Sequence, residues 1–224
     1  EWGACARLRS SWYSDTMKTI PSFRAHPWHG VSCGESAPEI VTCYVEIVPT
    51  DTVKFEIDKE SGILKVDRPQ KYSNHCPALY GFIPQTYCGD GVGELCARAL
   101  KKGSRIRGDG DPIDICILAD AAIAHGDILV RAKPIGGLQL LDRAEADDKI
   151  LAVLEGDAVF GAMSDISELP KAVIDRLMHY FLTYKLIPGS RKRAPVQVSQ
   201  VYGRKMAHRV IKQSIQDYRA LIGK

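Results

Sequence analysis

Three aspartates gather in a short segment that is rich in glycine and proline. Asp109, Asp111 and Asp114 stand within six residues, in the sequence Gly-Asp-Gly-Asp-Pro-Ile-Asp. Carboxylates this close together repel one another unless cations neutralise them. Their oxygens are hard ligands, which Mg²⁺, Mn²⁺ or Ca²⁺ prefer and zinc does not. The segment therefore predicts a divalent-cation site, with an acidic surface turn as the plain alternative.

Two known acidic motifs, the EF-hand loop and the phosphotransferase D-x-D, match this segment less well. An EF-hand loop that starts at Asp109 needs Gly at its sixth position and Glu at its twelfth, and those positions hold Asp114 and Asp120. A phosphotransferase-type D-x-D follows a buried strand, whereas residues 103–108 are polar and basic. A shared metal site or a surface turn is thus favoured over both.

A second acidic cluster lies further along the chain, with four carboxylates in seven residues. Asp142, Glu145, Asp147 and Asp148 precede Lys149 and separate the apolar residues 135–141 and 150–154. Alone, such a charge run is usually a solvated loop between strands. If both acidic loops cap neighbouring strands, they can share metal ions, which is the arrangement used for phosphoryl hydrolysis.

Candidate phosphate-binding residues lie on a predicted hairpin. Residues 53–58 alternate strictly, with Lys54 and Glu56 on the face opposite the apolar side chains. Glu46 ends the preceding predicted strand, and Arg68 ends the following one. Cations here can hold phosphate oxygens. On the pattern alone, a solvent face with weak cross-strand ion pairs is the favoured explanation.

Other polar residues have plainer explanations. Tyr184 and Lys185 end a predicted helix. Core packing explains Tyr184, and a favourable interaction with the helix dipole explains Lys185, as well as phosphate binding does. His75 and Cys76 are neighbours, but no third residue supports a nucleophile pair. No phosphate-binding loop of the G-x-x-x-x-G-K-[ST] type is present.

Short strands must position these residues. Strand patterns joined by Gly- and Pro-rich turns recur at residues 41–48, 53–58, 63–67, 81–84, 113–118, 127–135 and 150–154. They predict a small barrel or sandwich. Helical spacing follows over residues 173–184 and again from about residue 203 to residue 221. Residues 87–108 are expected to be a long connection without regular structure, of the kind that is usually functional.

Bulk properties limit the alternatives. The 224 residues suit one globular domain over residues 39–224, preceded by a surface arm over residues 1–38. The net charge of +3 is too small to imply nucleic acid. No apolar run approaches the roughly 18 residues of a membrane span. The odd count of seven cysteines without C-x-x-C predicts reduced thiols in a cytoplasmic protein.

The first sixteen residues lack the apolar core of a signal peptide. Met17 is a candidate natural start, which would make the preceding residues an extension. A trimmed organelle-targeting segment is the alternative.

Several of these motifs occur together in one known family, in the same order and spacing. The chain resembles the family I soluble inorganic pyrophosphatases over roughly residues 40–187, and residues 26–30 and the long segment before Asp109 look most like the chlamydial-type members. The resemblance rests on Val-Glu-Ile at 45–47, residues 53–62, Val-Asp-Arg at 66–68, residues 77–86, the D-x-D-P-x-D signature at 109–114, residues 142–149, and His-Tyr-Phe with Tyr-Lys at 179–185.

The resemblance implies a fold and a reaction. The fold is α+β with a mainly β core, a five-stranded OB-like β-barrel with two C-terminal helices packed outside. The reaction is Mg²⁺-dependent hydrolysis of pyrophosphate to two phosphates, with Mn²⁺ as an alternative metal. The implied protein is a homo-oligomer, dimer or hexamer, without nucleic-acid or membrane partners.

The resemblance also implies roles for individual residues. Asp111 would be the general base, and Tyr80 and Lys149 would orient metal ligands or the product phosphate. The metal ligands would be Asp109, Asp114, Asp147, Asp142 and Glu56. Phosphate oxygens would be held by Lys54, Arg68, Tyr184 and Lys185. Glu46 and Asp67 would be carboxylates that contact the metal- and phosphate-binding residues without binding metal themselves.

Three departures from the family pattern affect the interface, metal affinity and pH optimum more than the activity. Cys76 stands where many members have Tyr, Arg143 stands where some have an acidic residue, and residues 87–108 are longer than in compact bacterial members.

Two rival functions stay open at this stage. An OB-fold binder of single-stranded nucleic acid needs a basic groove with stacking aromatics. The basic residues 190–193 are compatible with it, but the acidic loops repel phosphates when no metal is bound. A phosphatase of organic phosphates is the second rival.

Overall fold

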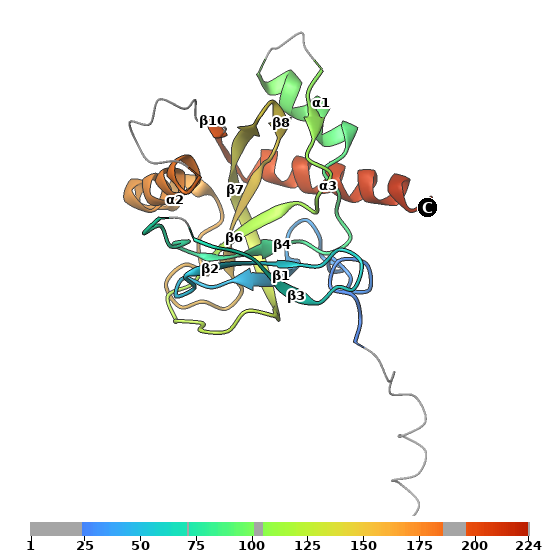
Figure 1. Cartoon of the computed structure of the whole chain (residues 1–224). Coiled ribbons are helices and arrows are strands. Elements are labelled where there is room, and N and C mark those ends of the chain that lie inside the picture. Colours follow the sequence, from blue (N-terminus) through green and yellow to red (C-terminus); the bar gives the residue numbers. More distant parts are fainter. Residues whose placement is uncertain (1–23, 71, 101–104, 186–195, 224) are drawn as a thin grey trace, which may run out of the picture.

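Five strands of the barrel close into a ring. The structure, a computed structural model, describes residues 24–70, 72–100, 105–185 and 196–223 (Figure 1). Around the ring, each strand pairs with two neighbours in the order β1 (Val41–Ile47), β4 (Leu79–Phe82), β6 (Asp114–Leu118), β9 (Lys149–Leu154), β7 (Ile128–Asp142) and back to β1. The predicted OB-like, five-stranded barrel is confirmed.

β7 is longer than its sequence pattern predicts. Its first half pairs with β1 and its second half with β10 (Val196–Gly203), while β9 pairs along its middle. The register shifts between Pro134 and Gly136, the signature of a bulge that bends a strand. A Cβ at Gly136 would lie only 2.6 Å from the carbonyl oxygen of Tyr202. Pro134 and Gly136, which usually interrupt strands, therefore allow β7 to bend and to pair with β1 along its first half and with β10 along its second.

β6 and β9 are covered on both faces, which explains their unbroken apolar runs. Ile115, Ile117 and Ile150 belong to a cluster that includes side chains of β1 and α3 (Arg204–Leu221). Cys116 and Leu151 point the other way, into a cluster with α2 (Lys171–Thr183). The start of each strand, where the acidic segments lie, is thus held by two cores.

A separate hairpin packs beside the ring. β2 (Val53–Ile57) and β3 (Leu64–Pro69) pair only with each other among the described residues. Ile57 is buried in a cluster with Trp28 and Tyr44. Glu46 Oε1 on β1 accepts a 2.8 Å hydrogen bond from the Ile57 amide, which ties the hairpin to the barrel.

Two helices near the C-terminus lie outside the barrel, as predicted. α3 packs along β7 and β10, and α2 lies beside β10 (Figure 1). A 3₁₀ turn at Ile166–Glu168 precedes α2 and is closed by a capping box from Asp165.

The prediction for residues 87–108 is wrong. They contain helix α1 (Asp90–Ala99), which packs on α3, and the short strand β5 (Arg107–Gly108), which pairs with β8 (Glu145–Ala146). The carboxylate of Asp217 on α3 accepts hydrogen bonds from the amides of Gly89 and Val92, at 3.1 and 3.0 Å. Free amides at the start of α1 are satisfied in this way.

The described part of the predicted arm, residues 24–38, packs against the domain. Arg24 forms an ion pair with Asp127, and Trp28 Nε1 donates to the Thr86 carbonyl oxygen at 2.8 Å. Met17 and the rest of residues 1–23 lie outside the described residues, as do the basic residues 190–193.

Candidate active site

Asp114 and Lys149 lie opposite each other at the starts of two parallel strands. They are register partners on β6 and β9. The ammonium group of Lys149 donates to Oδ2 of Asp114 and to Oδ1 of Asp147. The ladder between these strands thus brings together the acidic residues 109–114 and 142–148.

Asp109 and Asp147 are partly buried carboxyl groups beside this lysine. Burial, followed by the charge of Asp147, raises the pKa of Asp109 to about 8. Burial also raises the pKa of Asp147; Lys149 opposes the shift and Asp114 adds to it. Each carboxylate is therefore costly to ionise without a cation nearby, and such groups concentrate at functional sites.

Tyr80 on β4 approaches the same aspartate from the other neighbouring strand. Its hydroxyl group donates to Oδ2 of Asp114 at 2.6 Å. Lys149 is 3% exposed, and its ammonium lies 5.9 Å from the ring centre of Phe181 on α2. Burial lowers the pKa of this lysine, but the charges of Asp114 and Asp147 outweigh burial and hold it well above its ordinary value. Lys149 is therefore a fixed positive charge.

The hairpin forms another wall of the site. Lys54 Nζ contacts Oε2 of Glu56 at 2.6 Å and Oδ2 of Asp67 at 3.1 Å. A cavity of about 80 Å³ lies between this wall and the barrel. Its polar lining consists of Glu46, Lys54, Glu56, Lys59, Tyr80, Asp111 and Asp114.

Lys54 and Glu56 consequently face a cavity shared with the acidic segment, not open solvent as the alternation alone favours. Arg68 contacts Asp67 and is not among the residues lining this cavity.

The end of α2 meets the second acidic segment. Lys185 Nζ donates to Oδ2 of Asp142 at 2.5 Å and lies 5.2 Å from the ring centre of Tyr184. Oδ1 of Asp142 is buried and accepts no hydrogen bond from any described residue. An unsatisfied buried carboxylate oxygen is unfavourable unless a cation or donor reaches it.

The donor chemistry of the acidic segments suits a hard divalent cation. Within the described ranges, no three His, Cys, Asp or Glu side chains stand together as a preformed ligand set. Lys149 instead places a positive charge between Asp114 and Asp147. Asp109, Asp114 and Asp147 therefore fit a divalent cation, because their oxygens are hard ligands and their clustered negative charges require neutralisation. Asp114 and Asp147 also contact Lys149.

Sequence comparison identifies the family to which this arrangement belongs. The family profile described as "Inorganic pyrophosphatase" matches residues 43–219, which include both acidic segments, the hairpin and the end of α2. The chain belongs to the inorganic pyrophosphatase family.

Individual relatives agree with this pyrophosphatase assignment. The chain is 52% identical to the inorganic pyrophosphatase of Chlamydia muridarum over 205 residues, which is 90% of this chain and 98% of that protein. It is 34% identical to soluble inorganic pyrophosphatase 2 of Chlamydomonas reinhardtii, over 87% of this chain and 88% of that one. The predicted likeness to chlamydial-type members is confirmed.

Solved pyrophosphatase structures share the fold. The inorganic pyrophosphatase of Thermus thermophilus superimposes with a TM-score of 0.71 at 26% identity, covering 88% of this chain and 99% of that one. Nothing in these comparisons favours the nucleic-acid-binding alternative.

Sequence reasoning missed two residues that contact the acidic segments of this candidate site. Lys59, on the turn after β2, contacts Oδ1 of Asp111. Tyr202, at the end of the unpredicted strand β10, donates to Oδ2 of the buried Asp148 at 2.9 Å. Neither contact has a local sequence signal, because each joins segments that are far apart in the chain.

The nucleophile-pair hypothesis finds no support. Cys76 is buried, and burial raises the pKa of its thiol to about 12. His75 is exposed. A thiol that is hard to ionise is a poor nucleophile.

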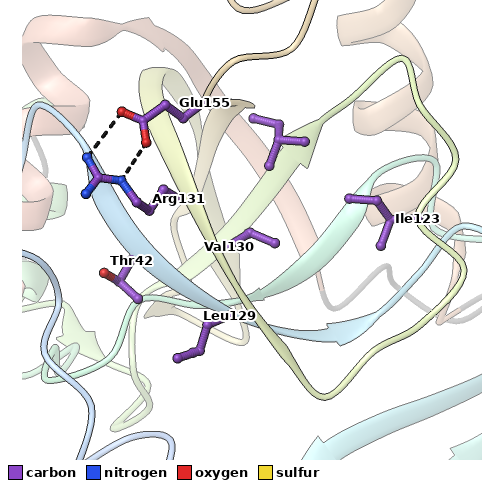
Figure 2. Close-up of a pocket in the computed structure, with 7 residues that line it drawn as sticks. Thr42, Ile123, Leu129, Val130, Arg131 and Glu155 are labelled. Atoms are coloured by element: carbon purple, nitrogen blue, oxygen red, sulfur yellow. Dashed lines mark hydrogen bonds and ion pairs between the residues drawn. The ribbon is translucent and has the colours of Figure 1, made fainter. Parts of the chain in front are cut away.

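A larger hollow of about 460 Å³ lies elsewhere, over β1 and β7 (Figure 2). Its lining is mostly apolar, including Ile123, Leu129 and Val130. Its charged residues neutralise each other, since Arg131 Nε donates to Glu155 Oε2 at 2.5 Å (Figure 2). This hollow contains none of the predicted site residues.

No helix of the described chain is both long and apolar enough to cross a bilayer.

Proposed function

We propose that this chain hydrolyses inorganic pyrophosphate to two orthophosphates, with Mg²⁺ as the metal and Mn²⁺ as its substitute. Membership of the pyrophosphatase family supports the reaction. The observation that carries the proposal is the convergence of two acidic segments on Lys149, facing a wall that bears Lys54.

Asp109, Asp114 and Asp147 would hold one metal ion, and Asp114 would be shared with a second. Asp142 with Asp147 would hold a metal that arrives with the substrate, and Glu56 a further one. The raised pKa values of Asp109 and Asp147 and the unsatisfied oxygen of Asp142 support these assignments. When bound, the metal supplies charge neutralisation for the phosphates and makes a water molecule more acidic.

Asp111 would accept the proton from the attacking water. Its carboxylate lines the cavity and is 42% exposed, so it is open to solvent and substrate. The Asp111 amide donates to Oδ1 of Asp109 at 3.0 Å, which fixes the base relative to a proposed metal ligand. A base within hydrogen-bond reach of its proton is the first requirement of general base catalysis.

Cations on two sides would hold the phosphate oxygens. Lys54 and Arg68 come from the hairpin, and Tyr184 and Lys185 come from the end of α2. Each of the three cations contacts a carboxylate, of Asp67, Glu56 or Asp142. Phosphate oxygens can replace these partly exposed carboxylate contacts, because both kinds of acceptor suit the same donors.

Tyr80 and Lys149 would orient the metal ligands, as their shared contact with Oδ2 of Asp114 supports. Glu46 and Asp67 would not contact metal or substrate but would support residues that do. Glu46 fixes the hairpin through the Ile57 amide, and Asp67 fixes Lys54.

Phosphate release from pyrophosphate, measured with and without Mg²⁺, tests the function. We expect rapid release that depends on the metal. The same assay with a phosphate monoester separates a pyrophosphatase from an organic phosphatase. Equal turnover of both substrates, or salt-dependent binding of an oligonucleotide without any phosphate release, would overturn the proposal.

We also propose that the protein is a cytoplasmic homo-oligomer, dimer or hexamer, with residues 1–38 as an arm on a single domain over residues 39–224. Light scattering of the full chain measures the mass in solution. A monomeric mass would contradict this part of the proposal.

A further inference from the structure

The segment around His26 is attached to the hairpin turn that carries Lys59. His26 Nε2 donates to the Lys59 carbonyl oxygen at 3.1 Å, because a carbonyl can only accept. His26 Nδ1 accepts from the Trp28 amide, also at 3.1 Å. These two bonds together require the tautomer with its proton on Nε2.

The turn itself is closely packed against this segment. Gly62 has φ of +71°, and a Cβ on it would lie 2.8 Å from both His26 Cδ2 and Pro27 Cδ. Oδ2 of Asp58 accepts from the Ser61 amide at 3.0 Å, which closes the turn from within. The backbone of Lys59 is therefore held from two sides.

The same segment also holds the opposite wall of the cavity. The backbone amide of Gln85 donates to the Trp28 carbonyl oxygen at 2.9 Å. Trp28 Nε1 in turn donates to the Thr86 carbonyl oxygen. Thr86 Oγ1 then accepts from the Ile113 amide at 3.0 Å. Ile113 follows Asp111 by two residues, so residues 26–28 connect Lys59 on one wall with Asp111 on the other.

Lys59 and Asp111 meet across the mouth of the cavity. Lys59 Nζ contacts Oδ1 of Asp111, and among the described residues no donor reaches Oδ2. Both side chains are partly exposed, at 49% and 42%. An exposed ion pair contributes little to stability, so the bracing of both partners needs another explanation.

We infer that Lys59 is a positioning residue for the reaction, which orients Asp111 through Oδ1 and leaves Oδ2 to accept the proton, and that residues 26–28 brace this pair. The inference rests on the proposed function, since it assumes that Asp111 is the base. It assigns to Lys59 no contact with substrate.

Kinetics of Lys59→Met and Lys59→Arg on pyrophosphate test the inference. A misplaced base slows the chemical step without weakening substrate binding, so we expect kcat to fall about tenfold in Lys59→Met with KM changed less than about twofold. Lys59→Arg should restore most of kcat. Lys65→Met is the matched control, because Lys65 forms an ion pair of similar exposure with Asp58 on the same hairpin. An increase in KM at unchanged kcat would overturn the inference, as would unchanged kinetics.

Double mutants show whether Lys59 acts through Asp111. Lys59→Met should cost nothing further in an Asp111→Asn background, because coupled residues are not additive. His26→Phe keeps a ring against Gly62 but removes the bond to the Lys59 carbonyl, and we expect a smaller loss of kcat, about threefold. This loss should vanish in the Lys59→Met background. Fully additive losses would refute the coupling.

A measurement without substrate separates this inference from the proposed function. Nuclear magnetic resonance of the full chain should show a shift of the Asp111 amide signal in Lys59→Met but not in Lys65→Met. Absence of that shift would refute the positioning role even in an active enzyme. Wild-type protein that releases no phosphate from pyrophosphate would refute the function while leaving the measured contact intact.

Discussion

The hydroxyl group of Tyr80 donates a 2.6 Å hydrogen bond to Oδ2 of Asp114, which joins β4 to the first residue of β6. Tyr80→Phe removes this donor from a partly buried carboxylate. A hydrogen bond to a charged group is worth about 1.5–3 kcal/mol, and Lys149 still contacts the same oxygen, so we expect the free energy of unfolding to fall by about 1–2 kcal/mol. Urea unfolding measures the change. Tyr72→Phe, at an exposed position, is the control, and equal stability of both variants would contradict the prediction.

Asp114→Asn should nearly abolish Mg²⁺-dependent hydrolysis while the protein stays folded. Asparagine keeps the size of the side chain but removes the charge that holds both Lys149 and the proposed metal. Phosphate release and circular dichroism, measured on one preparation, check the two halves of this expectation. Asp175→Asn, which alters an exposed ion pair on α2, should retain full activity. Full activity of Asp114→Asn would remove its assignment as a metal ligand.

Mg²⁺ should raise the melting temperature of the chain without any substrate. Saturation at one hundred times Kd adds about 2.7 kcal/mol of stability, which corresponds to about 5–10 °C for a domain of this size. Differential scanning calorimetry measures the shift. In Asp147→Asn the shift should be much smaller, and in Asp175→Asn it should match the wild type. An unchanged shift in Asp147→Asn would place the cation elsewhere.

Glu46 should make the metal-free protein less stable as pH rises. Burial raises the pKa of Glu46 to about 8 from its ordinary value of 4.5. Between these values the folded state keeps a proton that the unfolded state releases, so the stability that Glu46 contributes is complete below about pH 4.5 and is lost as pH rises through about 8.

Glu46→Gln removes this titration and can still accept from the Ile57 amide. In EDTA, we expect the unfolding free energy of Glu46→Gln minus that of wild type to increase between pH 5 and pH 8, by on the order of 1–3 kcal/mol, because only wild type loses stability over this range. Urea unfolding at several pH values measures the slope. Glu94→Gln, on the exposed face of α1, should keep the wild-type slope. A parallel slope in Glu46→Gln would contradict the assignment.

Tyr202→Phe should destabilise the fold although Tyr202 lies outside the predicted site. Its hydroxyl group donates to Oδ2 of the buried Asp148, whose Oδ1 accepts no hydrogen bond from any described residue. Leaving a buried carboxyl without its donor costs about 1–3 kcal/mol. Tyr218→Phe, which removes a part-buried bond to His29, should cost less, and a larger effect there would contradict the argument.

The barrel strands could be predicted from alternating apolar residues or, in β6 and β9, from unbroken apolar runs, and the helices α2 and α3 from an apolar stripe. Helix α1 escaped prediction because Gly91 and Gly93 disfavour a helix, although Val92 and Cys96 recur at helical spacing and are buried. β10 escaped because the alternation of residues 196–199 breaks at Gln200, which is exposed where an apolar residue is due and where the register shifts.

The types of the site residues could be predicted from local motifs, but their partners could not. Lys59 lies in the matched hairpin segment, yet nothing in its neighbourhood indicates contact with Asp111. The pairing of Tyr202 with Asp148 depends on Gly137, where a Cβ would lie 2.5 Å from the tyrosine hydroxyl. Such long-range pairs follow from the folded topology and not from any local pattern.

The parallel register of Asp114 and Lys149 has a consequence for how the protein loses activity. Backbone hydrogen bonds hold neighbouring strands about 4.8 Å apart. The distance between the acidic segments is therefore set by the pairing of β6 with β9 and not by the loops. Fraying of α1 or of the chain ends leaves that distance unchanged. Heat inactivation should therefore coincide with cooperative melting of the barrel, with no earlier inactive intermediate.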